Sequence, residues 1–241
     1  KANRARALTT RGSIGLTLLD PNTGAARTIE TPKGAIVNGA TWSPDGKSIG
    51  YIASFDATTH IYVADVASGK SVQVTKTPLL AVRVTDFDWT SDGKNIVTVL
   101  LPDNRAAEPK APAIETGPLV RVSDGRVLKN VNYASLLRDQ HEKDLLDYYT
   151  LGQLALIDVK TKAVKKIGQP ALITAVDASP DGQYFRVTLQ TKPYSYVVPV
   201  SNFGTVDQIW DANGKVLAEI AKRPLNEGRT TAGLDTTQGF G

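Results

Sequence analysis

The sequence contains no cysteine and only two histidines in 241 residues. The absence of cysteine excludes disulfide bonds, thiolate metal sites and a cysteine nucleophile. Neither His60 nor His141 stands in a spacing typical of metal ligands, so we interpret both as surface or packing residues. We therefore expect no metal ion and no cofactor in this chain.

Long apolar runs are also missing. No stretch approaches the roughly 18 apolar residues of a membrane-spanning helix, and the chain begins at Lys1 without an apolar signal core. This predicts a processed chain or a piece of a larger one, with a periplasmic or secreted location favoured and chloroplast or cytoplasm left open. The net charge is +4, but the basic residues are scattered and accompany no recognition motif, so we expect no nucleic-acid partner.

One turn motif occurs three times, at Trp42–Ile49, Trp89–Ile96 and Ala178–Phe185. Its shared core of Ser or Thr, then Pro or Ser, then Asp-Gly predicts a tight turn, because Asp can bond the backbone ahead of it and Gly accepts a positive φ. A strand of apolar residues follows each copy. We interpret Asp45, Asp92 and Asp181 as turn formers on separate hairpins rather than as a carboxylate site.

A second turn signal alternates with the first. An apolar strand ends in Asp and is followed by a short turn at Asp20, Asp65, Asp158 and Asp211. Trp42 and Trp89 are 47 residues apart and Asp20 and Asp65 are 45 apart, close to the period of about 40–50 residues of a propeller blade. The sequence therefore predicts an all-β fold of four-stranded antiparallel β-propeller blades in an incomplete ring.

The blades are expected at 13–30 (partial), 35–75, 80–168 and 170–220, after a disordered lead-in over 1–12 and before a tail at 221–241 without strand signal. The first strand of the blade at 80–168 is expected at Val82–Trp89. Trp42, Trp89 and Trp210 are expected to pack in the core.

The blade at 80–168 carries an insertion over about 102–150, because Asp158 follows Asp65 by 93 residues. The insertion begins with prolines that favour irregular chain and contains an expected small hairpin at 123–126. It ends in a helix from Asn132 to about Tyr149, with Leu137, Leu145 and Tyr149 on one side. Asp139 and Glu142 have the spacing of a capping box.

The segment Lys192–Tyr196 interrupts two strands with two tyrosines and a cation. Binding residues are often placed in such loops on a rigid scaffold. We therefore take Lys192, Tyr194 and Tyr196 as candidate substrate-binding residues, against the simpler interpretation of a structural loop. Arg186 is added as a second basic residue that could contact an acidic side chain if its strand points it inward.

Several segments together resemble the N-terminal propeller of prolyl oligopeptidase family (S9) serine peptidases, in particular their glutamyl-endopeptidase-like branch. The resemblance covers roughly Ile14 to Ile220 and depends on four segments: 80–89, 111–118, 146–158 and 193–199. Thr90-Ser91 departs from the usual Ser-Pro of the repeat.

The resemblance implies a peptidase whose Ser-Asp-His triad lies on an α/β-hydrolase domain outside these 241 residues, with the propeller as a gate and substrate wall. No catalytic residue is assigned in this chain, since Gly12-Ser13-Ile14-Gly15 lacks the spacing of a nucleophile elbow. The implied partners are a peptide substrate and the hydrolase domain, and homo-oligomers are left open because strand edges are expected to be exposed. The alternatives are a non-catalytic TolB-like propeller that binds a protein partner and a small four-bladed scaffold or lectin-like propeller.

Overall fold

The computed structural model describes residues 12–112 and 136–227. Within them the chain forms three four-stranded antiparallel sheets, one two-stranded sheet and one α-helix. Of the expected lead-in and tail, residues 1–11 and 228–241 lie outside the described residues, as does the hairpin expected at 123–126. The tail expected from residue 221 begins later, because the last strand of the third four-stranded sheet continues to Arg223. No helix within those two ranges is long and apolar enough to cross a membrane.

The sheets are meanders in chain order. The two-stranded sheet pairs β1 (Leu16–Leu19) with β2 (Ala26–Ile29). The first four-stranded sheet contains β3 (Ile36–Trp42), β4 (Ser48–Ser54), β5 (Thr59–Asp65) and β6 (Ser71–Gln73). The second contains β7 (Phe87–Trp89), β8 (Asn95–Leu100), β9 (Gln153–Asp158) and β10 (Val164–Lys166). The third contains β11 (Ile173–Ala178), β12 (Tyr184–Gln190), β13 (Thr205–Asp211) and β14 (Val216–Arg223).

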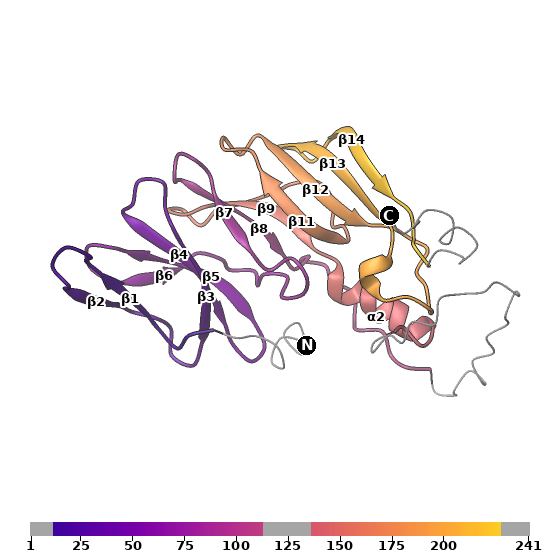
Figure 1. The fold of residues 1–241 in the computed structure, drawn as a ribbon, viewed down its shortest axis with the longest axis horizontal. Helices are drawn as coiled ribbons and strands as arrows, with labels where there is room; N and C mark the ends of the chain where they lie inside the picture. The colour runs from indigo at the N-terminus through magenta and orange to yellow at the C-terminus, as the bar shows by residue number, and fades with distance from the viewer. Residues whose placement is uncertain (1–11, 113–135, 228–241) are drawn as a thin grey trace, which may run out of the picture.

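Helix α2 (Gln140–Thr150) precedes β9, and a 3₁₀ turn, η1 (Val200–Asn202), precedes β13. The sheets follow one another side by side, from β1 and β2 at one end of the molecule to β14 at the other (Figure 1). The predicted fold class is confirmed: the chain is an incomplete propeller of four-stranded blades.

The first turn motif has the predicted geometry in all three copies. The Asp45 carboxylate accepts from the Lys47 backbone N–H at 3.0 Å and from the Ser43 hydroxyl at 2.7 Å, while Gly46 has φ of 67°. The Ser43 hydroxyl and the Lys47 N–H together lower the pKa of Asp45. Asp92 and Asp181 repeat these contacts in their own hairpins, so their role as turn formers is confirmed.

The departure at Thr90-Ser91 has a structural explanation. The Thr90 hydroxyl donates to Asp92 at 2.7 Å, as the serine hydroxyls do in the other two copies. Ser91 has a backbone N–H that a proline would lack, and it donates to the Pro180 carbonyl of the next blade at 2.7 Å. This departure therefore adds a hydrogen bond between blades.

Side chains that point alternately to the two faces of a strand fill the spaces between the sheets. In β8, Ile96 and Leu100 face the sheet of β3–β6, whereas Val97 and Val99 face the sheet of β11–β14. Burial on both faces is expected for a strand between two layers. The first interface consists of Ile52, Ile61, Val63, Val74, Leu79, Phe87, Ile96, Leu100, Ala155 and Ile157. The second interface consists of Leu80, Val97, Val99, Leu154, Ile167, Ile173, Phe185, Val187 and Trp210.

Gly50 in β4 shows how closely these sheets approach. A Cβ at this position would lie 2.7 Å from the Phe87 ring of the next sheet and 3.1 Å from the Trp89 ring. Only glycine leaves room for the two aromatic rings without a shift of the backbone.

Three sequence expectations need correction. The strand expected at Val82–Trp89 begins only at Phe87, because Arg83 adopts a left-handed φ of 67° that a strand does not allow. Helix α2 begins at Gln140, so Leu137 precedes it. Trp42 is not a core residue: it is 54% exposed, whereas Trp210 is buried in the second interface and Trp89 packs at the edge of the first.

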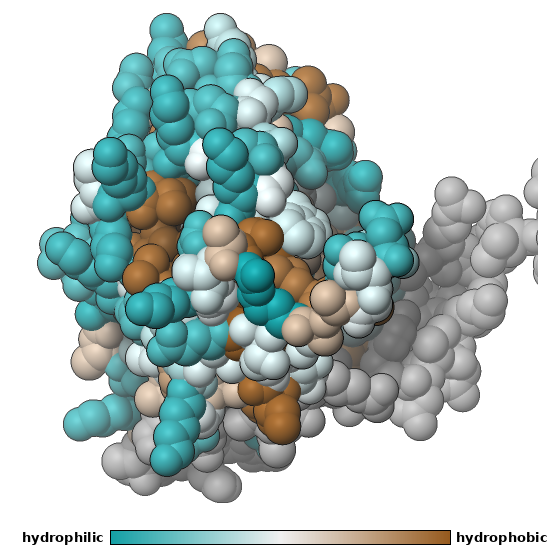
Figure 2. Space-filling view, turned by 90° about the vertical axis from the view of Figure 1, so that its left-hand side faces the viewer, coloured by the Kyte–Doolittle hydropathy of each residue, from teal (hydrophilic) through white to brown (hydrophobic). Residues whose placement is uncertain are grey.

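Trp42 instead borders a shallow apolar hollow beside β1, together with Leu16, Leu18, Leu19 and Ile49. The hollow lies between β1 on one side and β3 and β4 on the other. Figure 2 views the molecule from this side and shows small hydrophobic patches among hydrophilic residues.

The meander topology separates the connections into two groups. The Asp-Gly turns join β3 to β4, β7 to β8 and β11 to β12 at one end of the sheets. The longer connections lie at the opposite end, since successive turns of an antiparallel meander alternate between ends. These longer connections are 74–86, the insertion before β9 and 191–204, and we call this end the loop end.

Candidate functional site

Helix α2 at the loop end begins at a well-defined cap. The Asp139 carboxylate accepts from the Glu142 backbone N–H at 2.8 Å, as the capping-box spacing predicts. The Glu142 carboxylate reaches back one residue further than a standard capping box, to the Arg138 backbone N–H at 2.6 Å. The cap holds the start of the helix in place.

The helix packs against the 191–204 connection. Leu146 lies against a small cluster of Tyr194, Val198 and Phe203, in which the Tyr194 and Phe203 rings stack with centroids 5.2 Å apart. Leu146 is one residue away from the face expected from Leu145 and Tyr149.

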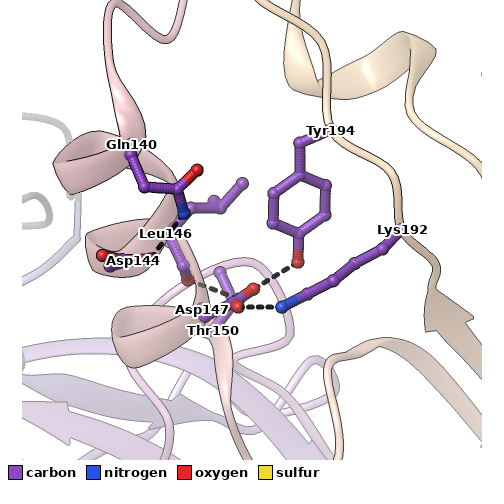
Figure 3. Close-up of polar contacts among 7 residues, drawn as sticks. All are labelled: Gln140, Asp144, Leu146, Asp147, Thr150, Lys192 and Tyr194. Atoms are coloured by element: carbon purple, nitrogen blue, oxygen red, sulfur yellow. Dashed lines mark hydrogen bonds and ion pairs between the residues drawn. The ribbon is translucent and has the colours of Figure 1, made fainter.

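Asp147 is the polar centre of this contact. Its carboxylate accepts a hydrogen bond from the Tyr194 hydroxyl and pairs with the Lys192 ammonium at 2.5 Å (Figure 3). Burial and then the adjacent Asp147 carboxylate raise the pKa of Tyr194 above its usual range, so the phenol stays protonated and donates.

Lys143 lies one helical turn before Asp147, on the same face of α2. Its ammonium donates to the Tyr194 backbone carbonyl at 3.0 Å and lies 3.6 Å from the centre of the Tyr196 ring. We call the contacts of Lys143, Leu146 and Asp147 with Lys192, Tyr194 and Tyr196 the α2 junction.

The other side of α2 is held by the beginning of the insertion. The Arg105 guanidinium lies 3.7 Å from the centre of the Tyr148 ring and donates to the Tyr148 carbonyl at 2.6 Å. Two sets of contacts therefore hold the helix in place: those of Arg105 with Tyr148, and those of the α2 junction.

Three of the four predicted site residues therefore meet at one place, and the fourth does not. Arg186 is in β12 and its guanidinium pairs with Asp207 at 2.9 Å and with Asp177 at 3.7 Å. The hydrogen bond and charge of Arg186 lower the pKa of Asp207. Both basic residues expected to meet an acidic substrate, Arg186 and Lys192, are thus paired with carboxylates of the chain itself.

The sequence did not single out Arg83, Lys143, Asp147 or Gln190 as site residues. Asp147 lay within one of the segments that carried the family resemblance, so a signal for it existed. Arg83 had none, because an arginine between two valines is typical of a strand. Among the described residues, the charged side chains that contact Tyr194 or act on its hydroxyl group include the cations Arg83, Lys143 and Lys192 and the carboxylate of Asp147. The arrangement is suited to hold acidic or carbonyl groups.

The letters Gly46-Lys47-Ser48-Ile49-Gly50 match the pattern G-x-S-x-G. They form a hairpin turn and the first residues of β4, whereas a nucleophile elbow joins a strand to a helix. His60 is buried in β5, where its ring contacts Thr75 and Gln73. In the part of the chain that the structure describes, no three His, Asp or Glu side chains gather as metal ligands would.

The sequence is similar to two curated proteins named "probable glutamyl endopeptidase, chloroplastic". The protein from Oryza sativa is 31% identical over 205 residues, and the one from Arabidopsis thaliana is 29% identical over 204; each alignment covers 81% of this chain. Most of the chain is therefore similar to one segment of proteins named glutamyl endopeptidases. The resemblance predicted from the sequence is confirmed. The chain spans about a fifth of the length of these relatives.

No family model matches the chain. Among solved structures, acylaminoacyl peptidase from Pyrococcus horikoshii superposes over 86% of this chain and 27% of its own, with a TM-score of 0.50 and 15% identity. At that identity the likeness shows the propeller fold alone.

Proposed function

We propose that this propeller forms the gate and part of the substrate wall of a serine peptidase that cleaves peptides after acidic residues. The observation that carries the proposal is the 31% identity to a probable glutamyl endopeptidase over 81% of the chain. The catalytic Ser-Asp-His triad would lie on a linked α/β-hydrolase domain and cleave through an acyl-enzyme. This chain would contribute shape and charge rather than a nucleophile.

The loop end supports this role. It gathers the long connections of the sheets, and its cluster around Tyr194 has an excess of positive charge. A surface of that kind attracts peptides with acidic side chains and repels basic ones. The rigid sheets below it restrict how far the connections can open.

Fluorophosphonate labelling of the protein from its source tests the proposal. A labelled band well above the 25.8 kDa of this chain, together with cleavage of a peptide after Glu, is the expected result. An unlabelled protein of any size overturns the proposal and moves a TolB-like propeller that binds a protein partner to first place.

The gate itself needs a separate test. In the full polypeptide, Tyr194→Ala removes both the ring stacking and the hydroxyl contact that hold α2, so we expect faster cleavage of a long peptide relative to a short one. Lys47→Gln, in a turn at the opposite end, is the matched control and should leave the ratio unchanged. An unchanged ratio in both variants excludes gating by this contact.

A further inference from the structure

Arg83 stands out at the loop end because of its backbone. It lies in the connection from β6 to β7 with φ of 67°, a conformation that only a few per cent of residues other than glycine adopt. Its guanidinium donates a hydrogen bond to the side-chain carbonyl of Gln190, at the end of β12. With this left-handed backbone, the Arg83 side chain reaches from the connection between two blades to Gln190 in the following blade.

The charge of Arg83 is not neutralised by a carboxylate in the way that the charges of Lys192 and Arg186 are. Lys192 pairs with Asp147, and Arg186 pairs with Asp207 and Asp177. Across residues 12–112 and 136–227, the ion pairs include none between Arg83 and a carboxylate. The residue is exposed to solvent overall, while partial burial lowers the pKa of its guanidinium.

Gln190 adds a second donor. It is only 7% exposed, and its Nε2 amide has no hydrogen-bond partner within the described part of the chain. Its Oε1 is already taken by Arg83, so Nε2 and the remaining N–H groups of Arg83 form a group of donors that lacks an acceptor. A buried donor without an acceptor is costly, so its presence points to an acceptor supplied from outside.

We infer that Arg83 binds a carboxylate of the peptide substrate, and that Gln190 positions its guanidinium. This inference rests on the proposed function and names the residue that would make the peptidase prefer acidic substrates. The planar guanidinium can hold a carboxylate through two parallel N–H···O bonds, which a lysine cannot do. The carboxylate is either the acidic side chain of the substrate or the C-terminus of a short peptide.

The test uses the full polypeptide and four peptides: one with Glu at the cleaved position and its Gln counterpart, each with a free and an amidated C-terminus. Calorimetry measures binding and kcat/KM measures turnover. For Arg83→Gln we expect binding of, and kcat/KM for, the Glu peptide to fall about 10- to 100-fold, with the Gln peptide changed less than about twofold. Arg83→Lys should restore only part of the loss.

The controls separate the outcomes. Lys47→Gln removes one positive charge at the opposite end and should leave both peptides unaffected. If amidation rather than Glu→Gln abolishes the effect, the bound carboxylate is the C-terminus. If Arg83→Gln leaves both the Glu-to-Gln ratio and the free-to-amidated ratio of binding unchanged, or if wild-type protein does not bind the acidic peptides, the inference is wrong. Binding that depends on Arg83 in a protein without peptidase activity would retain this inference and overturn the proposed function.

Discussion

The two interfaces between the sheets and the α2 junction hold the chain together in different ways. The interfaces are built from aliphatic and aromatic side chains that alternate along the strands and are almost all buried. The α2 junction combines one leucine with an ion pair, a phenol hydroxyl and a cation above an aromatic ring. The first kind of contact is non-directional and recurs from blade to blade, whereas the second occurs once and depends on the position of each atom.

The difference explains where specificity can arise. Apolar burial stabilises any pair of sheets with matching faces, and its free energy scales with the area removed from water. The polar contacts of the junction contribute less stability but fix the orientation of the loops at the loop end. We therefore expect substitutions in the interfaces to change stability, and substitutions in the junction to change local order and substrate selection.

Phe185→Ala should have the largest effect on stability. The ring is fully buried in the second interface, and its removal should lower the free energy of unfolding by about 3–5 kcal/mol. Tyr184→Ala, one residue earlier in β12 and half exposed, is the matched control and should cost less than about 1 kcal/mol. Urea unfolding followed by tryptophan fluorescence measures both. Equal losses would mean that the interface does not stabilise the fold as described.

Asp147→Ala should have an intermediate effect. It leaves the nearly buried Tyr194 hydroxyl without an acceptor, which should cost about 1–3 kcal/mol. Lys192→Met removes the mostly exposed partner of the same carboxylate and should cost at most about 1 kcal/mol. Hydrogen exchange should show the loss of protection in α2 rather than in β8. Loss of protection spread equally over both would contradict the distinction between junction and interfaces.

His60 in a four-stranded sheet and His141 on α2 allow the same comparison to be made through the pH dependence of stability. Burial in the first four-stranded sheet lowers the pKa of His60 below its ordinary 6.5, so the folded state binds a proton less readily than the unfolded chain. The part of the free energy of unfolding that depends on neutral His60 is therefore fully present above about pH 6.5, and it falls as the pH drops from there toward the folded-state pKa. Urea midpoints at several pH values should show this fall in the wild type and in His141→Gln, whose site is on α2. The fall should be absent in His60→Gln, and its persistence there would assign it to another group.

Lys162→Gly should have the smallest effect. Lys162 has φ of 62° in the turn after Asp158, where the equivalent turns place Gly24, Gly69 and Gly214. Relief of the left-handed strain exceeds the entropy that glycine loses on folding, so we expect about 0.5 kcal/mol of added stability. Gly24→Lys makes the reverse exchange in an open turn and should lower stability by about 1 kcal/mol. Thermal unfolding of both variants checks the sign.

Some elements could be predicted because their information is local. The Asp-Gly turns, the strands that follow them and the cap at Asp139 each depend on residues within a few positions of one another. The exposure of Trp42 could not be predicted, because it depends on how the sheet of β1 and β2 lies beside β3 and β4. The left-handed turn at Arg83 also carries no local signal, since arginine has no preference for that conformation.

The candidate site was predicted only in part. Lys192, Tyr194 and Tyr196 were identified from an interruption between two strands, and they do meet at one place. Their partners on α2 come from about 50 positions earlier in the chain, and only the packing of the helix brings them together.

The amino-acid sequence by itself determines the blade repeat, its turns and the apolar faces of the strands, because each follows from short-range hydrogen bonding and from a period of two residues. The tertiary structure alone decides which charges are neutralised within the chain. Within the described residues Arg186 and Lys192 pair with carboxylates and Arg83 does not. That outcome depends on which strands and connections lie side by side, which short-range patterns in the chain do not encode.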